Sequence, residues 1–234
     1  MHDKTNKNVR IAGRNGNTAA ATGLVFNATY ESQALLFETP GILQVSSSSA
    51  NDAAAGTGAR SVKISGFDAA GELIEETLAM NGQTAVPSTK QFASIMDVRI
   101  VTAGSGGVNA GNIFVAPSVT ALTAGVPNGN TIITMIEIGY GTANQWQFKV
   151  PALHEASIAK LTVGAEALEH RLEVKRPGEG WNVLAQILVN TESPVVVPAP
   201  AVRFPPGSVF RLRYVDGAGS NIVNDVLQLN VLPR

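Results

Sequence analysis

The sequence predicts an all-β fold, a β-sandwich of jelly-roll-like type preceded by an extended N-terminal arm. Two observations favour this class. Several runs alternate apolar with polar residues, as half-buried strands do, and Gly, Pro and Asp fall between the runs at the positions of turns. No segment keeps a convincing helical period. At 234 residues the chain is long enough to bury a hydrophobic core without covalent cross-links.

Residues 1–40 are expected to form the arm. Gly, Asn, Thr and Ala dominate up to Gly23, and no hydrophobic period holds there. Two apolar triplets interrupt this composition, and we expect them to anchor the arm on a partner surface: Leu24, Val25 and Phe26, then Leu35, Leu36 and Phe37. We therefore predict that residues 1–40 fold onto another subunit. The turn signal Pro40-Gly41 ends the arm.

Residues 41–234 are expected to form the sandwich body. Its first half contains a hairpin, 61–68 with 72–81, around a turn in which Asp68 and Gly71 supply the turn chemistry. Other strands are expected at 42–47, 92–102, 112–119 and 131–138. We favour one sandwich because no charged or flexible linker divides the body. Two subdomains, at about 41–125 and 140–234, are the alternative.

Alternation is clearer in the second half of the body. Strands are expected at 145–150, 168–175, 181–189, 210–214 and 227–231. One face is assigned to Trp181, Val183, Ala185, Ile187 and Val189, and both Trp146 and Trp181 are expected in the core. Tyr140, between two glycines, is the freest of the large aromatic residues. The best helix candidate, 153–159, is too short and too β-branched to be convincing.

Composition excludes several classes of function. The chain has no cysteine, which removes disulfides, thiolate zinc sites and a cysteine nucleophile. Its 17 basic and 18 acidic residues give a net charge of −1, without the clustered basic patch that nucleic-acid binding needs. We expect no signal peptide and no membrane helix, because the uncharged stretch 100–136 is rich in Gly, Asn and Pro.

The titratable residues do not assemble into a predicted site. His170 lies near Glu169 and Glu173, but strand alternation sends the two carboxylates to the opposite face, so no metal site is expected. Glu72, Glu75 and Glu76 resemble the paired carboxylates of glycoside hydrolases, yet adjacent strand residues also point apart. No nucleophile elbow or P-loop occurs. We predict a non-enzymatic protein without cofactor, metal or small-molecule substrate.

The segment 49–113 resembles structural proteins of tailed bacteriophages, namely capsid decoration (cement) and head-fibre-like proteins. The resemblance lies in a loop, NDAAAGTGARSVKISG, a hairpin, FDAAGELIEETLAMNG, and a strand that ends in VTAGSGGVNAGNI. The ending from Pro205 to Leu232 is similar to the last strands of jelly-roll virion proteins. These residues are turn and strand formers, so no active residue is carried over.

The resemblance implies a homotrimer on the exterior of a virion capsid. It implies the major capsid protein as partner, with neighbouring capsid subunits clamped together, and synthesis in the host cytoplasm. Two other readings remain open: a phage tail, fibre or carbohydrate-binding β-sandwich module, and an enzyme on a β scaffold. The first would need exposed aromatic residues in the loops, and the second would need convergent carboxylates or a histidine site.

Overall fold

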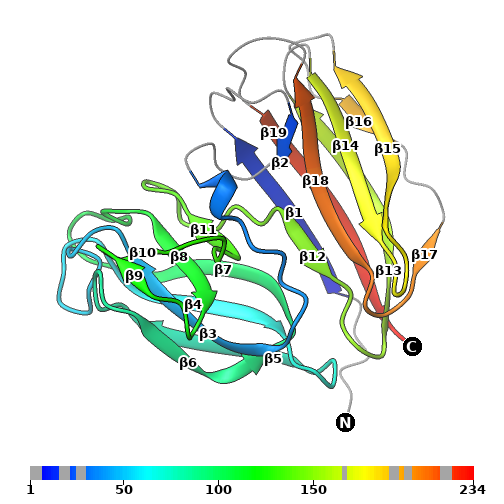
Figure 1. Ribbon diagram of the computed structural model, residues 1–234. Coiled ribbons are helices and arrows are strands. Elements are labelled where there is room, and N and C mark those ends of the chain that lie inside the picture. The colour runs from blue at the N-terminus through cyan, green and yellow to red at the C-terminus, as the bar shows by residue number, and fades with distance from the viewer. Residues whose placement is uncertain are drawn as a thin grey trace. The chain divides into compact units, whose positions relative to one another are not determined.

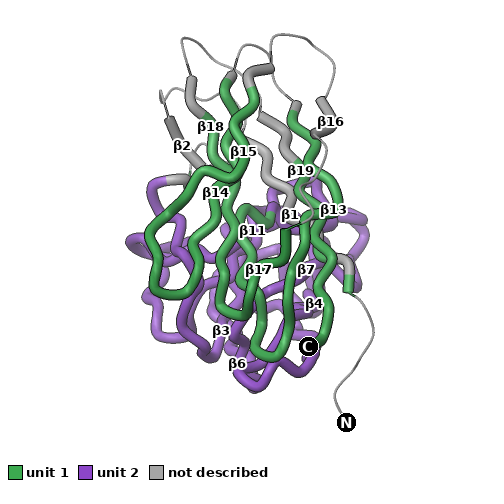
Figure 2. The backbone as a smooth tube through the Cα atoms, turned by 90° about the vertical axis from the view of Figure 1, so that its right-hand side faces the viewer, with its two compact units in different colours: residues 1–31, 145–234 green, residues 32–144 purple. Residues whose placement is uncertain are grey.

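A computed structural model describes residues 7–15, 22–24, 30–164, 168–189, 195–197, 202–216 and 223–234. The all-β prediction is confirmed, because the described residues form antiparallel sheets with one short 3-10 helix, η1 (Glu31–Gln33) (Figure 1). The chain divides into two compact units (Figure 2): unit 1 comprises residues 1–31 with 145–234, and unit 2 comprises residues 32–144. This organisation replaces the single sandwich that we favoured from the sequence.

Unit 2 contains two antiparallel sheets and a small hairpin. The first sheet has the order β11 (Thr134–Ile136), β8 (Ile113–Pro117), β3 (Gly41–Ser47) and β6 (Val86–Phe92). The second has the order β5 (Leu73–Ala79), β4 (Ala59–Phe67) and β7 (Ser94–Ala103). The hairpin pairs β9 (Leu122–Thr123) with β10 (Val126–Pro127). The expected hairpin around Asp68 is the β4–β5 pair.

The core of unit 2 lies between its two sheets. Val45 on β3 and Val115 on β8 come from one sheet, and Val62 and Ile64 on β4 come from the other; all four are fully buried. Alternation along the strands places these four apolar residues on the inner faces of their sheets. Unit 2 is therefore a small β-sandwich.

Unit 1 also contains two sheets. The first has the order β1 (Lys7–Asn15), β19 (Val223–Pro233), β13 (His154–Gly164) and β16 (Val195–Val197), with β17 (Arg203–Phe204) also paired to β13. The second has the order β12 (Gln147–Lys149), β18 (Val209–Asp216), β14 (Leu168–Lys175) and β15 (Trp181–Val189), with β2 (Thr22–Leu24) also paired to β18. Between the sheets, the rings of Phe204 and Phe210 meet edge to face with centroids 4.8 Å apart.

β13 occupies the place of the weak helix candidate at 153–159. It lies between β19 and β16 and has a register shift between Ile158 and Lys160. Its buried apolar residues are therefore Ala156 and Ile158 before the shift, and Leu161 and Val163 after it. The extra residue breaks the two-residue period, which hides the strand from a search for alternation.

A second bulge corrects the predicted face of β15. Val183 pairs with Glu173, whereas Ala185 pairs with Leu172, so one extra residue lies between them. Paired residues share a face, so Val183 lies on the face of the charged Glu173 and Ala185 on the face of the buried Leu172. The prediction that Val183 and Ala185 share one face is wrong for this reason.

The two tryptophans have different surroundings. Trp146 is 2% exposed and belongs to the core, as predicted. Trp181 pairs with Lys175 on the charged face, where the Arg211 guanidinium lies 3.7 Å from the centre of its ring. The core assignment of Trp181 is therefore wrong, because the residue stacks with a cation instead.

The expected N-terminal arm is divided among three places within this chain. β1 pairs with β19 along its whole length, and Leu24 of β2 pairs with Arg213. Val25 and Phe26 lie outside the described residues. Residues 32–40 belong to unit 2 and lead into β3. The prediction that this segment does not join its own sandwich is therefore wrong for β1 and β2, because they pair with β19 and β18 of the same chain. A contact of residues 1–40 with another subunit stays a prediction.

Candidate interaction surface

An apolar groove in unit 2 contains one of the two predicted anchor triplets. The groove has a volume of about 380 Å³ and is lined by residues 35–43 and 117–119. Glu38 is the one charged side chain in this lining. We call these residues the apolar groove.

Backbone hydrogen bonds fix the first wall of the groove. The Leu35 amide donates to the Ile132 carbonyl at 2.7 Å, and the Ile132 amide donates to the Gln33 carbonyl at 2.8 Å. Phe37 is buried in the unit 2 core and Leu35 packs against the same core, whereas Leu36 is half-buried. Leu35 and Phe37 therefore attach this segment to its own unit, and Leu36 remains partly available at the groove.

The second wall ends in an exposed valine. The Ser118 amide donates to the Ile42 carbonyl at 3.0 Å, and the Thr120 amide donates to the Pro117 carbonyl at 3.0 Å. This turn holds Val119 with 93% of its surface exposed. Val119 therefore presents an exposed apolar side chain at the end of the groove.

The loops of the resemblance segment are joined by a buried carboxylate. Asp52 is fully buried, and its Oδ1 accepts from the amides of Ala59 at 2.7 Å and Ala110 at 2.8 Å. Its Oδ2 accepts from the Gly111 amide at 2.9 Å and from the Ser47 hydroxyl at 2.6 Å. We call Asp52 with these four donors the Asp52 staple.

The staple explains why small residues fill these loops. A Cβ atom on Gly58 would lie 2.1 Å from Asp52 Oδ1, and one on Gly104 would lie 2.3 Å from the Gly56 carbonyl oxygen. Neither contact is compatible with a side chain, so the backbone approaches closely only because glycine is present. Close packing of the backbone therefore explains why Gly58 and Gly104 are glycines, without any bound ligand.

A neighbouring loop presents two exposed apolar residues. Asn109 Nδ2 donates to the Glu137 carbonyl at 2.9 Å, and the Ile138 amide donates to Asn112 Oδ1 at 2.8 Å. Ile138 is 58% exposed and Tyr140 is 45% exposed. Tyr140 is the most exposed of the large aromatic residues that the structure describes, in line with its position between two glycines. Side-chain amides of the resemblance segment thus support an exposed aromatic residue.

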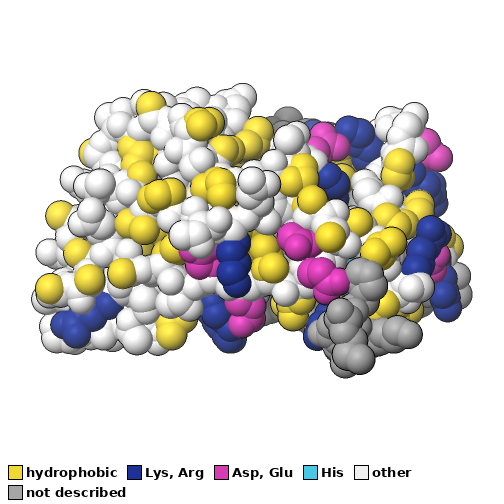
Figure 3. All heavy atoms as spheres, turned by 90° about the horizontal axis from the view of Figure 1, so that it is seen from below, with side chains coloured by type: hydrophobic (Ala, Val, Ile, Leu, Met, Phe, Trp, Pro, Cys, Tyr) yellow, Lys and Arg dark blue, Asp and Glu magenta, His cyan; other side chains and the backbone are white. Residues whose placement is uncertain are grey.

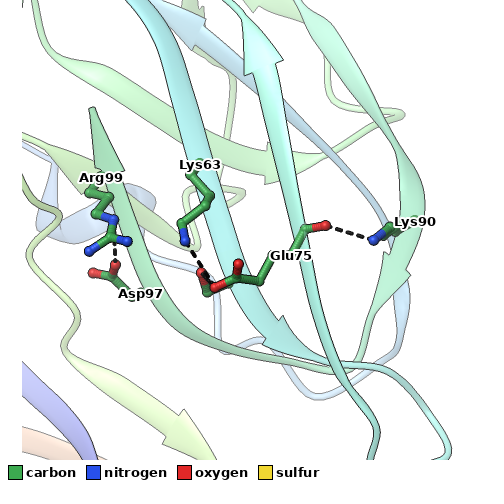
Figure 4. A network of polar contacts seen from close by, with 6 residues as sticks. Lys63, Glu75, Lys90, Asp97 and Arg99 are labelled. Atoms are coloured by element: carbon green, nitrogen blue, oxygen red, sulfur yellow. Dashed lines mark hydrogen bonds and ion pairs between the residues drawn. The ribbon is translucent and has the colours of Figure 1, made fainter. Parts of the chain in front are cut away.

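The carboxylates of the β4–β5 hairpin face opposite sides, as predicted. Glu75 accepts from Lys63 Nζ at 3.0 Å and from the Ser65 hydroxyl at 2.8 Å on the outer face (Figure 4). Glu76 instead accepts from the Thr89 and Lys90 amides at 2.8 and 3.0 Å, which ties β5 to β6. The two adjacent glutamates therefore do not form a carboxylate pair.

Asp97 lies on the same outer face as Glu75, across β4. Both residues pair with Ser65 in register, and Asp97 lies 3.7 Å from Arg99 Nε (Figure 4). The Lys63 ammonium, with the Ser65 hydroxyl, lowers the pKa of Glu75 below its ordinary value. Burial raises the pKa of Asp97. Both carboxylates are paired with cations in one ionic ladder across the sheet.

His170 lies where the sequence placed it. It is buried on the inner face of β14, while Glu169 contacts Arg171 and Glu173 accepts from Arg211 at 2.6 Å on the outer face. The three residues do not converge, and no group of three potential metal ligands occurs among the described residues. Within that same part of the chain, no helix is long and apolar enough to cross a membrane.

Comparisons with known proteins identify no family. No family model matches the chain, and no curated protein matches it. Among solved structures, a chain from the structure of infectious bursal disease virus Gt strain aligns at 11% identity and a TM-score of 0.18, covering 98% of this chain and 82% of that one. The VP2 subviral particle of the same virus aligns at 9% identity and a TM-score of 0.14, covering 98% and 81%. TM-scores this low do not establish a shared fold.

Proposed function

We propose that the chain is a non-enzymatic structural protein of a tailed-bacteriophage virion, a decoration protein that binds the capsid exterior and bridges major capsid subunits. The observation that carries the proposal is the apolar groove with its exposed Val119. The class of protein comes from the resemblance of residues 49–113. Their loops form a rigid part of unit 2, held by the Asp52 staple.

The chemistry of the groove indicates the kind of contact. Its lining carries one carboxylate and otherwise apolar or uncharged groups, so it suits apolar side chains on an extended segment of the major capsid protein. The face in Figure 3 carries apolar side chains dispersed among uncharged atoms, together with several Lys, Arg, Asp and Glu side chains. Burying Val119 in such a contact is worth roughly 1.5–3 kcal/mol, which is about tenfold or more in affinity.

Co-sedimentation with capsids tests the proposal. The probe is the empty head assembled from the major capsid protein of the phage that encodes this chain. We expect the wild-type chain to sediment with heads and to saturate at a fixed ratio to capsid subunits. Val119→Lys should weaken binding by tenfold or more. Val101→Lys is the matched control, because Val101 is 50% exposed on β7, away from the groove.

The outcomes separate the function from the site. A wild-type chain that stays in the supernatant at micromolar concentration contradicts the proposed function. Binding that Val119→Lys leaves unchanged contradicts the groove as the contact while leaving the function standing. The homotrimer that the resemblance implies is tested by mass in solution, where three chains of 24.3 kDa give about 73 kDa (3 × 24.3).

A carbohydrate-binding role in a tail or fibre is the second candidate. It is favoured by Tyr140, an exposed aromatic ring beside Ile138 in a loop that Asn109 and Asn112 hold. Aromatic faces of this kind stack on sugar rings. A glycan array probed with the labelled chain tests this role: binding that Tyr140→Ala abolishes supports it, and an array without signal contradicts it.

A further inference from the structure

Strands at the ends of sheets differ in how they are protected against pairing with other chains. A terminal strand presents unpaired backbone groups, and proteins guard such edges with charges, proline or a covering segment. Four of the five terminal strands with at least seven residues carry such guards: Lys7, Arg10 and Arg14 on β1, Glu75 and Glu76 on β5, Pro87 and Lys90 on β6, and Asp97 and Arg99 on β7.

β15 is the exception among these long strands in the described part of the chain. Its sequence, WNVLAQILV, has nine residues with no charge and no proline, and it pairs with β14 on one side. Figure 1 shows it at the end of its sheet, beyond β14. Val183 is 49% exposed, and Gln186 is exposed. At about 3.4 Å per residue, this edge is roughly 30 Å long.

The bulge guards only the first part of this edge. It lies between Val183 and Ala185, and the register from Ala185 to Val189 is regular. Five consecutive residues, AQILV, therefore present a regular and uncharged edge. Strands of about this length are the commonest in sheets, so the segment is long enough to pair with another strand.

We propose that β15 pairs antiparallel with β15 of a second copy of this chain, across a two-fold axis. Self-pairing of an uncharged strand brings no like charges together, whereas self-pairing of β1 would oppose three cations with three cations. The same strand from each copy makes a closed, self-complementary contact. The sheet ending in β15 then continues from one copy into the next, and the free backbone groups gain partners.

This contact does not depend on the proposed function. Because it is two-fold, it joins two chains, or two trimers where the chain is trimeric. Disrupting it therefore halves the mass of the assembly in either case. The contact also differs in place from the apolar groove, which belongs to unit 2, whereas β15 belongs to unit 1.

Two matched glutamate variants test the contact by light scattering during size exclusion. Gln186 is exposed in the regular part of β15 and pairs with Arg171, so a glutamate there meets a cation within the fold, yet it places like charges on both edges of the contact. We expect Gln186→Glu to halve the mass. Thr77→Glu, the same charge on an exposed residue of β5 opposite Lys63, should leave the mass unchanged.

Single cysteines test the contact by chemistry. The chain has no cysteine, so any disulfide in a single-cysteine variant joins two copies. A residue close to a two-fold axis meets its own counterpart within the 4.4–6.8 Å Cα separation that a disulfide needs. Under mild oxidation, we expect a covalent dimer from one of Ala185→Cys, Gln186→Cys and Ile187→Cys. None should form from Thr77→Cys on the exposed part of β5.

Three results would overturn the proposal. One is a mass that Gln186→Glu leaves unchanged, including a wild-type chain that is already monomeric. Another is the absence of a covalent dimer from all three β15 cysteine variants. The third is cross-linking of Thr77→Cys to the same extent, which would indicate random collision.

Discussion

Replacing Asp52 with alanine should destabilise unit 2 selectively. The side chain is fully buried and satisfies three backbone amides, those of Ala59, Ala110 and Gly111. Alanine leaves all three without their acceptor, while the Ser47 hydroxyl can rotate to another partner. A buried amide that loses its partner costs about 1–3 kcal/mol, so we expect a loss of roughly 3–5 kcal/mol after partial relaxation. That is a large part of the stability of a typical domain.

The assay exploits the placement of the tryptophans. Both, Trp146 and Trp181, lie in unit 1, so their fluorescence follows that unit, whereas far-ultraviolet circular dichroism follows both. In urea titrations, we expect Asp52→Ala to shift the dichroism transition that fluorescence does not report. Hydrogen exchange at the three freed amides should accelerate together, because they share one acceptor.

Asp68→Ala is the matched control for this prediction. Asp68 accepts from the Ala70 and Glu72 amides at 2.9 Å each, but it lies in a half-buried turn that water reaches. We expect a loss below about 1 kcal/mol, because water replaces the lost acceptor. The reasoning about Asp52 is refuted if Asp52→Ala costs no more than Asp68→Ala, or if the tryptophan transition shifts equally.

Four further predictions concern single side chains. The lowered pKa of Glu75 stabilises the fold above its unfolded pKa, so the wild type should lose stability relative to Glu75→Gln as pH falls below about 4.5. Asp97 has the opposite sign: its raised pKa makes the wild type gain stability relative to Asp97→Asn as pH falls towards 3.8, the ordinary pKa of an aspartate. Urea titrations between pH 3 and 6 check both, and slopes of equal sign would contradict them. His170→Ala should cost roughly 2–3 kcal/mol, because it leaves a cavity in unit 1; an unchanged urea midpoint would contradict this. Acrylamide should quench Trp146→Phe, which retains Trp181, more than Trp181→Phe; equal quenching would contradict the difference in burial.

Regular strands could be predicted from the sequence because nothing interrupts their alternation. In β14 the buried residues His170, Leu172 and Val174 alternate without a break, and the strand has the bounds expected. β13 and β15 each contain a bulge, which moves the apolar residues to the other parity partway along the strand. The bulge in β13 hides that strand from a search for alternation. The bulge in β15 explains why alternation predicts the wrong face for Trp181.

The arm was expected to extend elsewhere because its sequence has no apolar period. β1 nevertheless pairs with β19, because pairing between backbones does not require alternating side chains. Such pairing between segments more than 200 residues apart leaves no local signal. The boundary between the units at residues 144 and 145 is also unmarked in composition.

The groove and the staple differ in how far a sequence can reveal them. The triplet at Leu35 already indicated an apolar contact, and it does line the groove. Asp52 gave no such signal, because its donors are backbone amides at residues 59, 110 and 111 and carry no residue type to recognise. A polar residue among alanines and glycines is the only local sign of it.

The most direct test of the account is the co-sedimentation of this chain with empty phage heads, in parallel for the wild type, Val119→Lys and Val101→Lys. The account predicts saturable binding that Val119→Lys weakens by tenfold or more and Val101→Lys leaves unchanged. A wild-type chain that remains entirely in the supernatant would contradict the proposed decoration function.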